Sequence, residues 1–530
     1  MNVAGPRELG RQQQAYGSGV QLSPGTATYG HHVALPQPGT SGGPEEPDPA
    51  ADLASARLMG QRASRGAASV LLSSGIINIV QLASSLVLAR ALSPQEYGAF
   101  AVAATVVGFG RFLGDCGAGS AVIQQRGRSE PDRAELGRVF VLQAGVGSVA
   151  AIGLVLAAPA IRGLFDAPAD TTTIITVLAL TLVLEAPAVV PKVRLNRAQR
   201  YQRLQIVALV SALALYAVQI GGLLAGFGLY ALVAGQVVTS LVSTGLLLGF
   251  GGGVVRPVLR GAADLARRGL PYQGALTIQA LFAIASVGVV GTQLTTAELG
   301  LWTWCTVLAT PLLALAANLQ NIAFPALSRL HEHHVERHTE AVAMVARLQL
   351  LAVSAVVGVL CGLTVPLVDD LFDERWLGAV GAARAALLGV LPFLLAALLA
   401  ATVQSTGHPE LRLRAMGIST ATGVVSAVPL AAAFGTTGAA VAIYLLVPLV
   451  DAVLLARWVG IGLWRAYVNA VVVGGGSFLA AAAVAPRIDG LPSLLMIGAA
   501  VGLVGVALVP LTDRRALLVG WGALRGTVDR

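Results

Sequence analysis

Long apolar stretches follow one another along most of the chain, and short segments bearing arginine or lysine separate them. A membrane-spanning helix needs about 20 apolar residues, and stretches of this length recur from residue 67 onward. We predict fourteen spans, at 67–89, 98–123, 139–160, 172–191, 204–225, 228–250, 272–292, 299–322, 348–368, 380–403, 412–433, 437–456, 466–485 and 491–511. The pattern therefore predicts an all-α polytopic membrane protein.

The positions of arginine and lysine orient these spans, because cytoplasmic segments retain more of both residues than external segments do. With the N-terminus inside, the segments predicted to be cytoplasmic carry 25 such residues near the spans. The external connections carry only 4, namely Arg90, Arg162, Arg375 and Arg487. The asymmetry holds for every loop and predicts that both termini are cytoplasmic.

Two short motifs occur twice in the chain. LSPQEYG at Leu92–Gly98 returns 202 residues later as LTTAELG at Leu294–Gly300. PAIRGLFD at Pro159–Asp166 returns 207 residues later as PLVDDLFD at Pro366–Asp373. Because six predicted spans separate the copies, both copies have the same orientation in the membrane. Such parallel repeats are typical of transporters whose two bundles flank a central site.

The repeat divides the chain into five predicted parts. They are a disordered cytoplasmic tail (1–56), an N-lobe of spans 1 to 6 (57–250), a cytoplasmic linker (251–271), a C-lobe of spans 7 to 12 (272–460), and an additional helix pair with the C-terminal tail (461–530). The tail is rich in Gly, Pro, Ser and Gln and lacks a long apolar run. The linker reads as an amphipathic interfacial helix with Arg256, Arg260 and Arg267 on one face, or as an ordinary basic loop.

Composition excludes several classes of protein. The chain has 530 residues, of which 55% are hydrophobic and 12% charged, and its mean hydropathy is +0.74. These values leave no room for a large soluble catalytic domain. Cys116, Cys305 and Cys361 lie far apart in apolar runs and form no CxxC pair, so neither a disulfide framework nor a zinc site is indicated. The net charge of +8 follows from the topology and does not indicate a nucleic-acid partner.

Four segments resemble a known family. They are SVLLSSGIINIVQLASSLVLARALSPQEYGAFAVA at 69–103, LGDCGAGSAVIQQ at 113–125, ELGLWTWCTVLATPLLALAANLQNIAFPALSRL at Glu298–Leu330, and ERWLGAVGAARAALLGVLPF at 374–393. Together they resemble the polysaccharide transporters, the Wzx-type oligosaccharide flippases of the multidrug/oligosaccharidyl-lipid/polysaccharide exporter superfamily. The resemblance covers about residues 65–460 and is spread over many weak motifs.

This resemblance implies a protein of the bacterial inner membrane that moves a polyprenyl-pyrophosphate-linked saccharide outward by alternating access. It also implies a role in exopolysaccharide or lipopolysaccharide biosynthesis, without a cofactor and beside a polysaccharide polymerase or glycosyltransferase. One alternative is a drug or metabolite antiporter of the same superfamily. Another is a membrane polymerase or ligase, which is disfavoured because the longest external connection is about twelve residues and none contains His.

Ionisable residues inside spans are functional candidates, since burying a charge in the bilayer is costly. Arg111 and Asp115 are four residues apart in the second span, so they lie on one helical face. They read either as a self-neutralised structural pair or as a pair in the substrate cavity, where Arg111 would bind pyrophosphate. Glu185 in the fourth span is a candidate for proton or sodium coupling, or else a carboxyl that pairs with another helix.

Further polar residues at membrane depth are candidates for contacts with the saccharide, with inter-helix hydrogen bonding as the alternative. They are Asn78, Gln81, Gln279, Asn318 and Asn321, together with Arg90 at the outer end of the first span. Arg90 also reads as a headgroup anchor. The run HEHHVERH at His331–His338 has no HExxH order and predicts a solvated loop, so we predict no metal site.

Overall fold

The computed structural model describes residues 73, 75–115, 117–123, 131–253, 255–314, 335–462 and 464–487. The chain divides into Met1–Gly60 and Gln61–Arg530, and everything that follows concerns the second unit. The predicted tail, the fourteenth span, Asn318, Asn321 and most of the histidine run lie outside the described residues.

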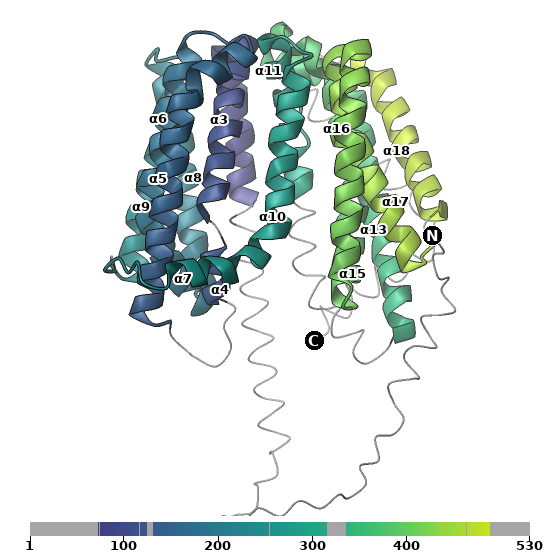
Figure 1. The fold of residues 1–530 in the computed structure, drawn as a ribbon. Helices are drawn as coiled ribbons and strands as arrows, with labels where there is room; N and C mark the ends of the chain where they lie inside the picture. The colour runs from purple at the N-terminus through teal and green to yellow at the C-terminus, as the bar shows by residue number, and fades with distance from the viewer. Residues whose placement is uncertain are drawn as a thin grey trace, which may run out of the picture. The chain divides into compact units, whose positions relative to one another are not determined.

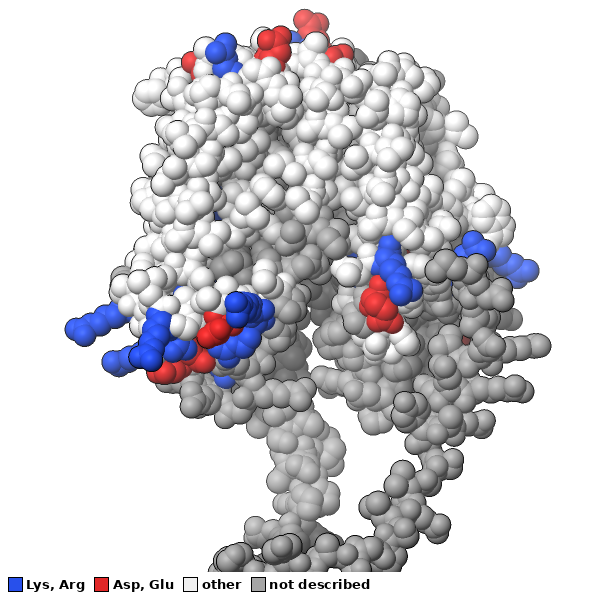
Figure 2. Space-filling view, viewed as in Figure 1, with Lys and Arg blue, Asp and Glu red and all other residues white. Residues whose placement is uncertain are grey.

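Every regular element in the described part of the chain is a helix. This follows from the apolar sequence, because a segment surrounded by lipid must satisfy its backbone hydrogen bonds internally. Nine helices within the described ranges are long and apolar enough to span a membrane, and Gly75–Ala91 is a shorter apolar helix. Figure 2 shows charged side chains gathered at two opposite ends of this face, with a band of uncharged residues between them. The predicted fold class is confirmed, whereas the count of fourteen spans remains a prediction.

The N-lobe begins with the helix Gly75–Ala91, which is followed by α3 (Pro94–Asp115) and the short α4 (Ala118–Ile123). The next helices are α5 (Arg133–Leu164) and α6 (Asp170–Glu185), and then η1 (Ala186–Ala188), α7 (Val189–Arg197), α8 (Tyr201–Leu224) and α9 (Leu229–Gly251). Helix α3 packs on α5 and α6, α6 packs on α9, and α8 packs on α9.

The C-lobe repeats this order. Its elements are α10 (Ala262–Gly291), α11 (Thr296–Trp304), α13 (Val335–Gly362), α14 (Thr364–Leu367), η2 (Val368–Phe372), η3 (Glu374–Ala379), α15 (Val380–Ser405), α16 (Pro409–Ala440), η4 (Val441–Leu446) and α17 (Val447–Val459). Helix α16 changes direction at Gly435, whose φ of 56° is accessible to glycine. Helix α15 lies at the centre and packs on α13, α16 and α17.

The second part of the predicted linker, from Ala262, and most of the predicted seventh span form one continuous helix, α10. Residues 255–261 before it are not helical, and Gly261 adopts a φ of 80° at its start. The first turns of α10 dock on the N-lobe through buried Leu265, which packs with Leu136 and Val139. Figure 1 shows α10 between the blue helices of the N-lobe and the green helices of the C-lobe.

One helix beyond the repeat packs on the C-lobe. Helix α18 (Trp464–Val484), the predicted thirteenth span, runs along α13. The backbones approach closely at Gly358, where a Cβ atom would collide with the carbonyl oxygen of Gly474. Small residues at such positions allow the close packing on which helix association in lipid depends. Helix α13 is therefore covered, whereas its N-lobe counterpart α5 remains exposed along most of its length.

Candidate functional site

An ion pair lies at membrane depth inside the N-lobe. The Nε of Arg111 on α3 donates to Oε2 of Glu185 on α6 at 2.8 Å. Arg111 stands about halfway along α3 and α4, and Glu185 about halfway along α6 and α7. The pair therefore joins the second and fourth spans near the middle of their lengths.

Hydroxyl groups complete the surroundings of this pair. Ser240 on α9 donates to Oε1 of Glu185 at 2.6 Å, so both carboxylate oxygens have a partner. Nη2 of Arg111 donates to Thr181 Oγ1 at 3.3 Å, and Thr181 donates to the carbonyl of Leu178. Three helices thus hold one carboxylate and one guanidinium by directional bonds, which fixes both groups without burying them completely.

The local sequence explains why Glu185 can serve three helices. It is the last residue of α6, and the 3₁₀ segment Ala186–Ala188 follows it. Pro187 has no N–H to donate, and a proline inside a helix breaks the regular hydrogen-bond ladder. The break separates α6 from α7, and Glu185 projects at this point. We call Arg111, Glu185, Ser240 and Thr181 the N-lobe polar cluster.

The exposure of the N-lobe polar cluster indicates contact with water. The side chain of Arg111 is 45% exposed and that of Glu185 is 27% exposed, although both lie at membrane depth. Exposing a charged side chain to lipid at this depth costs at least about 2.5–3.5 kcal/mol. A half-exposed guanidinium is therefore far more stable facing a water-accessible space, where an anionic ligand could also reach it.

The contact with Glu185 differs from the pairing that the sequence suggested. The spacing of Arg111 and Asp115 predicted a pair within one helix, but Arg111 bonds to Glu185, 74 residues away. The side chain of Asp115 lies outside the described residues, so its part in the site remains a prediction. Glu185 was expected to be a coupling site or a carboxyl that pairs with another helix. The structure shows it paired with Arg111 on another helix. Its role in coupling remains a prediction as well.

The remaining predicted site residues are dispersed. Asn78 and Gln81 are half-buried on the first helix and make no hydrogen bond with the described part of the chain. Arg90 is exposed, and its Nη2 donates to the carbonyl of Asp370 in the C-lobe at 3.2 Å, so it joins the two lobes. The side chain of Gln279, together with Asn318 and Asn321, lies outside the described residues. None of these described residues contacts the N-lobe polar cluster.

Several basic residues at the end predicted to be cytoplasmic have structural partners. Arg194 donates to the carbonyls of Gly251 and Gly252, and Arg203 donates to that of Phe250, all at the end of α9. Arg197 donates to the carbonyls of Val122 and Ile123 at the end of α4. Helix C-termini leave carbonyls without partners and carry a partial negative charge. These arginines therefore cap helices in addition to orienting the spans.

A second ion pair lies in the C-lobe; its arginine entered the sequence-based prediction only through the topology, and its aspartate was not considered. Nη1 of Arg412 on α16 donates to Oδ2 of Asp451 on α17. The Asp451 side chain is 10% exposed, and its Oδ1 is buried without a hydrogen-bond partner among the described residues. Asp451 inside an apolar span was the available signal, since an intramembrane acid calls for a partner on a neighbouring helix.

No metal centre emerges in the part of the chain that the structure describes, where no three His, Cys, Asp or Glu residues are grouped closely enough to hold an ion. His338 is the only histidine of the run among the described residues, and it is buried near the start of α13. Among the described residues the site therefore offers a guanidinium, a carboxylate and hydroxyl groups, which suit binding of an anion or a polar ligand.

Solved structures with a similar fold are transporters. An inward closed structure of the lipid II flippase MurJ superposes with a TM-score of 0.67, at 13% identity over 83% of this chain and 98% of that one. An inward-facing multidrug transporter of the MATE family and the MOP superfamily superposes with a TM-score of 0.55, at 17% identity over 74% of this chain and 95% of that one. At such identities the likeness concerns the fold.

Sequence comparisons point to polysaccharide biosynthesis. The succinoglycan biosynthesis transport protein ExoT of Rhizobium meliloti (strain 1021) is 31% identical over 157 residues, or 29% of this chain. The aligned part spans about a third of that relative, namely 31% of its length. The sequence pattern of the family described as polysaccharide biosynthesis protein matches residues 87–381, more than half of the chain. The chain belongs to the polysaccharide biosynthesis protein family.

Proposed function

We propose that this protein is a flippase that moves a lipid-linked saccharide precursor across the cytoplasmic membrane. The observation that carries the proposal is the half-exposed Arg111–Glu185 pair at membrane depth in a chain of this family. The two-lobed fold shared with a lipid II flippase supports it. Transport by alternating access needs no catalytic residue, and the chain is accordingly proposed to be a transporter and not an enzyme.

The N-lobe polar cluster suits the headgroup of such a substrate. A polyprenyl pyrophosphate brings negative charge into a region of low dielectric, where an unpaired charge is very costly. The fixed fork of an arginine matches phosphate oxygens and stays charged when partly desolvated. Glu185 holds Arg111 when the site is empty, and the pyrophosphate takes its place when the site is loaded. Asp115, one turn further along α3, is a second candidate partner for the arginine in the empty state.

An antiporter of drugs or metabolites is the second candidate, since a multidrug transporter shares the fold. The family match to polysaccharide biosynthesis favours the flippase. The two functions differ in the ligand that Arg111 would meet. A cationic drug would be repelled by the guanidinium, whereas a pyrophosphate would be attracted.

The proposed setting is the inner membrane of a bacterium, with both termini in the cytoplasm and a polymerase or glycosyltransferase acting on the same saccharide. The distribution of arginine supports this orientation. A cysteine in place of Asp166 should react with an impermeant thiol reagent added outside intact cells, whereas a cysteine in place of Ala198 should not. Labelling at position 198 from outside would contradict the orientation.

The proposal is tested by deleting the gene and following lipid-linked saccharides in the membrane. We expect one polyprenyl-linked oligosaccharide to accumulate on the cytoplasmic leaflet, and the wild-type gene to clear it. Arg111→Ala should fail to clear it while protein abundance stays within about twofold, and Arg111→Lys should restore only part of the activity because it lacks the fork.

Arg162→Ala is the matched control, since Arg162 is an arginine of the same lobe that donates to the carbonyl of Ala167 in its own loop. This variant should clear the precursor as the wild type does. If the deletion strain accumulates no lipid-linked saccharide, and instead becomes sensitive to cationic drugs, the flippase assignment is wrong and the antiporter is correct.

A further inference from the structure

The two copies of the first repeated motif contact each other across the lobes. Gly98 in the first copy lies against the carbonyl oxygen of Thr296, and Gly300 in the second copy lies against the carbonyl oxygen of Pro94. In both directions a Cβ atom would collide with that oxygen. Thr296 is the repeat equivalent of Pro94, so the contact is reciprocal. The first turns of α3 and α11 therefore meet on the axis that relates the two lobes.

Matching caps stabilise these two turns. Glu96 accepts hydrogen bonds from the N–H and the hydroxyl of Ser93, both at 2.8 Å. In the second copy, Glu298 accepts from the N–H and the hydroxyl of Thr295, both at 2.9 Å. Each pair forms a capping box, which fixes the start of a helix. The repeated letters in the sequence thus correspond to repeated geometry at the contact.

Both copies of the second repeated motif also contact the opposite lobe. In the first copy the ring of Phe165 lies against Gly291 at the end of α10, and the hydroxyl of Thr296 donates to the Phe165 and Asp166 carbonyls at 3.2 and 3.3 Å. In the second copy the loop after Phe372 reaches the end of the first helix, Gly75–Ala91. Each lobe therefore holds the other near its predicted external end.

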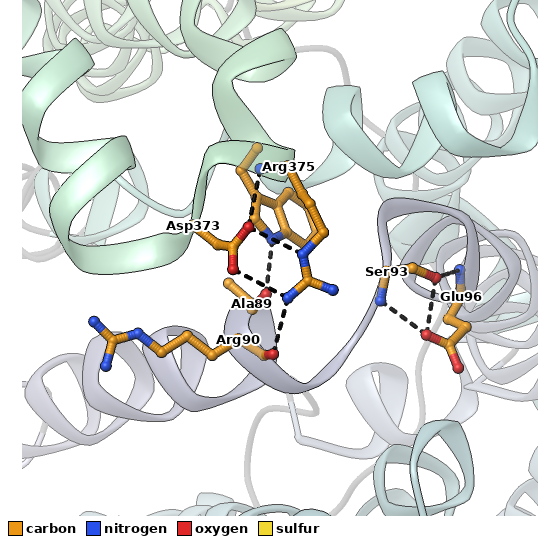
Figure 3. A network of polar contacts seen from close by, with 7 residues as sticks. Ala89, Arg90, Ser93, Glu96, Asp373 and Arg375 are labelled. Carbon is orange, nitrogen blue, oxygen red and sulfur yellow. Dashed lines mark hydrogen bonds and ion pairs between the residues drawn. The ribbon is translucent and has the colours of Figure 1, made fainter.

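The hydrogen bonds of the second copy of this loop are shorter than those of the first. Nη2 of Arg375 donates to the carbonyl of Arg90 at 3.0 Å, and the indole Nε1 of Trp376 donates to the carbonyl of Ala89 at 2.8 Å. Both carbonyls belong to the last turn of the helix, where backbone acceptors lack partners within the helix. Figure 3 shows these contacts together with the Ser93–Glu96 cap. The C-lobe loop thus caps a helix of the N-lobe.

Asp373 holds the side chain of Arg375 in the orientation of this contact. Its carboxylate accepts from Nε of Arg375 at 3.0 Å and from Nη2 at 3.2 Å, a bidentate pairing that fixes the plane of the guanidinium. The first copy of the loop has Pro168 and Ala169 where the second has Arg375 and Trp376. Neither of these residues has a side-chain donor, so the cap exists on one side of the axis only. We call Asp373, Arg375 and Trp376 the clasp.

Aromatic rings extend the contact inward from the clasp. Tyr97 of the N-lobe meets the Trp376 ring edge-on at 5.7 Å between centroids. Trp304 lies 5.1 Å from Trp376 and 4.6 Å from Phe372. Cys305 belongs to the same buried cluster and is completely buried. Because the Tyr97 ring comes from the N-lobe and the Trp376 ring from the C-lobe, moving the lobes apart at this end requires these two rings to separate.

We propose that the clasp is the releasable half of the external closure, and that Arg375 is the positioning residue that sets how often the protein opens outward. The glycine contact and the two capping boxes are symmetric and belong to helix starts. In the clasp, Trp376 is completely buried, whereas the side chains of Arg375 and Asp373 are 44% and 32% exposed, so water can replace the Arg375 bond. This inference rests on the proposed function only in assuming that the lobes move apart, and it can be measured without a substrate.

The test uses Cys305 of the full-length protein as a reporter of outward opening. Cys116→Ser and Cys361→Ala leave it as the single cysteine, and an impermeant maleimide is added outside intact cells. We expect Arg375→Ala to raise the labelling rate by about three- to tenfold, the effect of losing a partly exposed charged hydrogen bond. Asp373→Asn should have a smaller effect, because Arg375 keeps its bond to Arg90. Arg375→Lys should lie between Arg375→Ala and the parent.

Arg162→Ala is again the matched control, since it removes an external arginine whose bond stays within one lobe. It should label like the parent, and all variants should label fully after denaturation in detergent. Equal labelling of Arg375→Ala and Arg162→Ala would overturn the proposal. A protein that labels as expected but transports no saccharide would contradict the proposed function and leave the clasp intact.

Discussion

The two lobes each contain an ion pair between neighbouring spans, and the pairs differ in exposure and in hydrogen bonding. In the N-lobe, Arg111 is 45% exposed and Glu185 is 27% exposed, and both oxygens of the carboxylate have partners. In the C-lobe, Arg412 is 28% exposed and Asp451 is 10% exposed, and Oδ1 of Asp451 has no hydrogen-bond partner within the part of the chain that the structure describes. Similar chemistry thus occurs in two different environments.

The difference indicates which pair can change partners. The N-lobe pair is partly exposed, so a ligand that reaches it could replace the carboxylate at a small net cost. The C-lobe pair is packed among residues of the main core, including Ala452 and Leu455. Separating a buried pair leaves an uncompensated charge, which is strongly unfavourable. The N-lobe pair is therefore suited to binding, and the C-lobe pair to joining α16 to α17.

The largest expected effect concerns the buried pair. Asp451→Ala leaves Arg412 charged without its carboxylate, and breaking such a pair costs about 3–5 kcal/mol. We expect a much lower unfolding temperature in detergent and a loss of protein from the membrane. Combining Arg412→Leu with Asp451→Leu should recover most of the stability, since apolar replacement of both partners is often neutral. If Asp451→Ala is as stable as the wild type, the comparison between the lobes fails.

A smaller effect on stability is expected for the exposed pair, with a larger effect on transport. Glu185→Gln keeps oxygen and nitrogen atoms in place for hydrogen bonds but removes the charge that holds Arg111. A partly exposed ion pair contributes about 1 kcal/mol or less, so the unfolding temperature should change little. Transport should fall because Arg111 is no longer returned to its resting position. Ser240→Ala, which removes one hydroxyl donor to Glu185 but leaves the ion pair with Arg111, is the comparison variant and should be milder.

The sequence predicted the helical membrane fold from apolar length, and it singled out Arg111 as a candidate from the cost of buried charge; the role of Arg111 stays a prediction. The sequence did not predict the partner of Arg111, since spacing along one helix identified Asp115, whereas Glu185 is on a neighbouring helix. Arg90 was expected to anchor lipid or bind substrate, and its contact with Asp370 depends on how the lobes meet. Contacts between distant helices follow from packing, which a single sequence does not reveal.

The smallest expected effect concerns a third pair, Asp373 and Arg375, which extends the comparison to the external surface. Hydrogen bonds from Arg375 are the main cause that lowers the pKa of Asp373 below its ordinary value of 3.8. A carboxyl whose pKa is lower in the folded state contributes its stabilisation above the ordinary pKa and loses it as the pH falls through the lowered value. Between about pH 5 and 8 the pair therefore stays ionised. Labelling of Cys305 from outside, corrected for the reactivity of a free thiol at each pH, should be constant over this range in the parent and in Asp373→Asn. A contrary result would be a rise in corrected labelling toward pH 5 that occurs in the parent and not in Asp373→Asn. It would mean that Asp373 takes up a proton near neutral pH, so that the exposed pair behaves like a buried one.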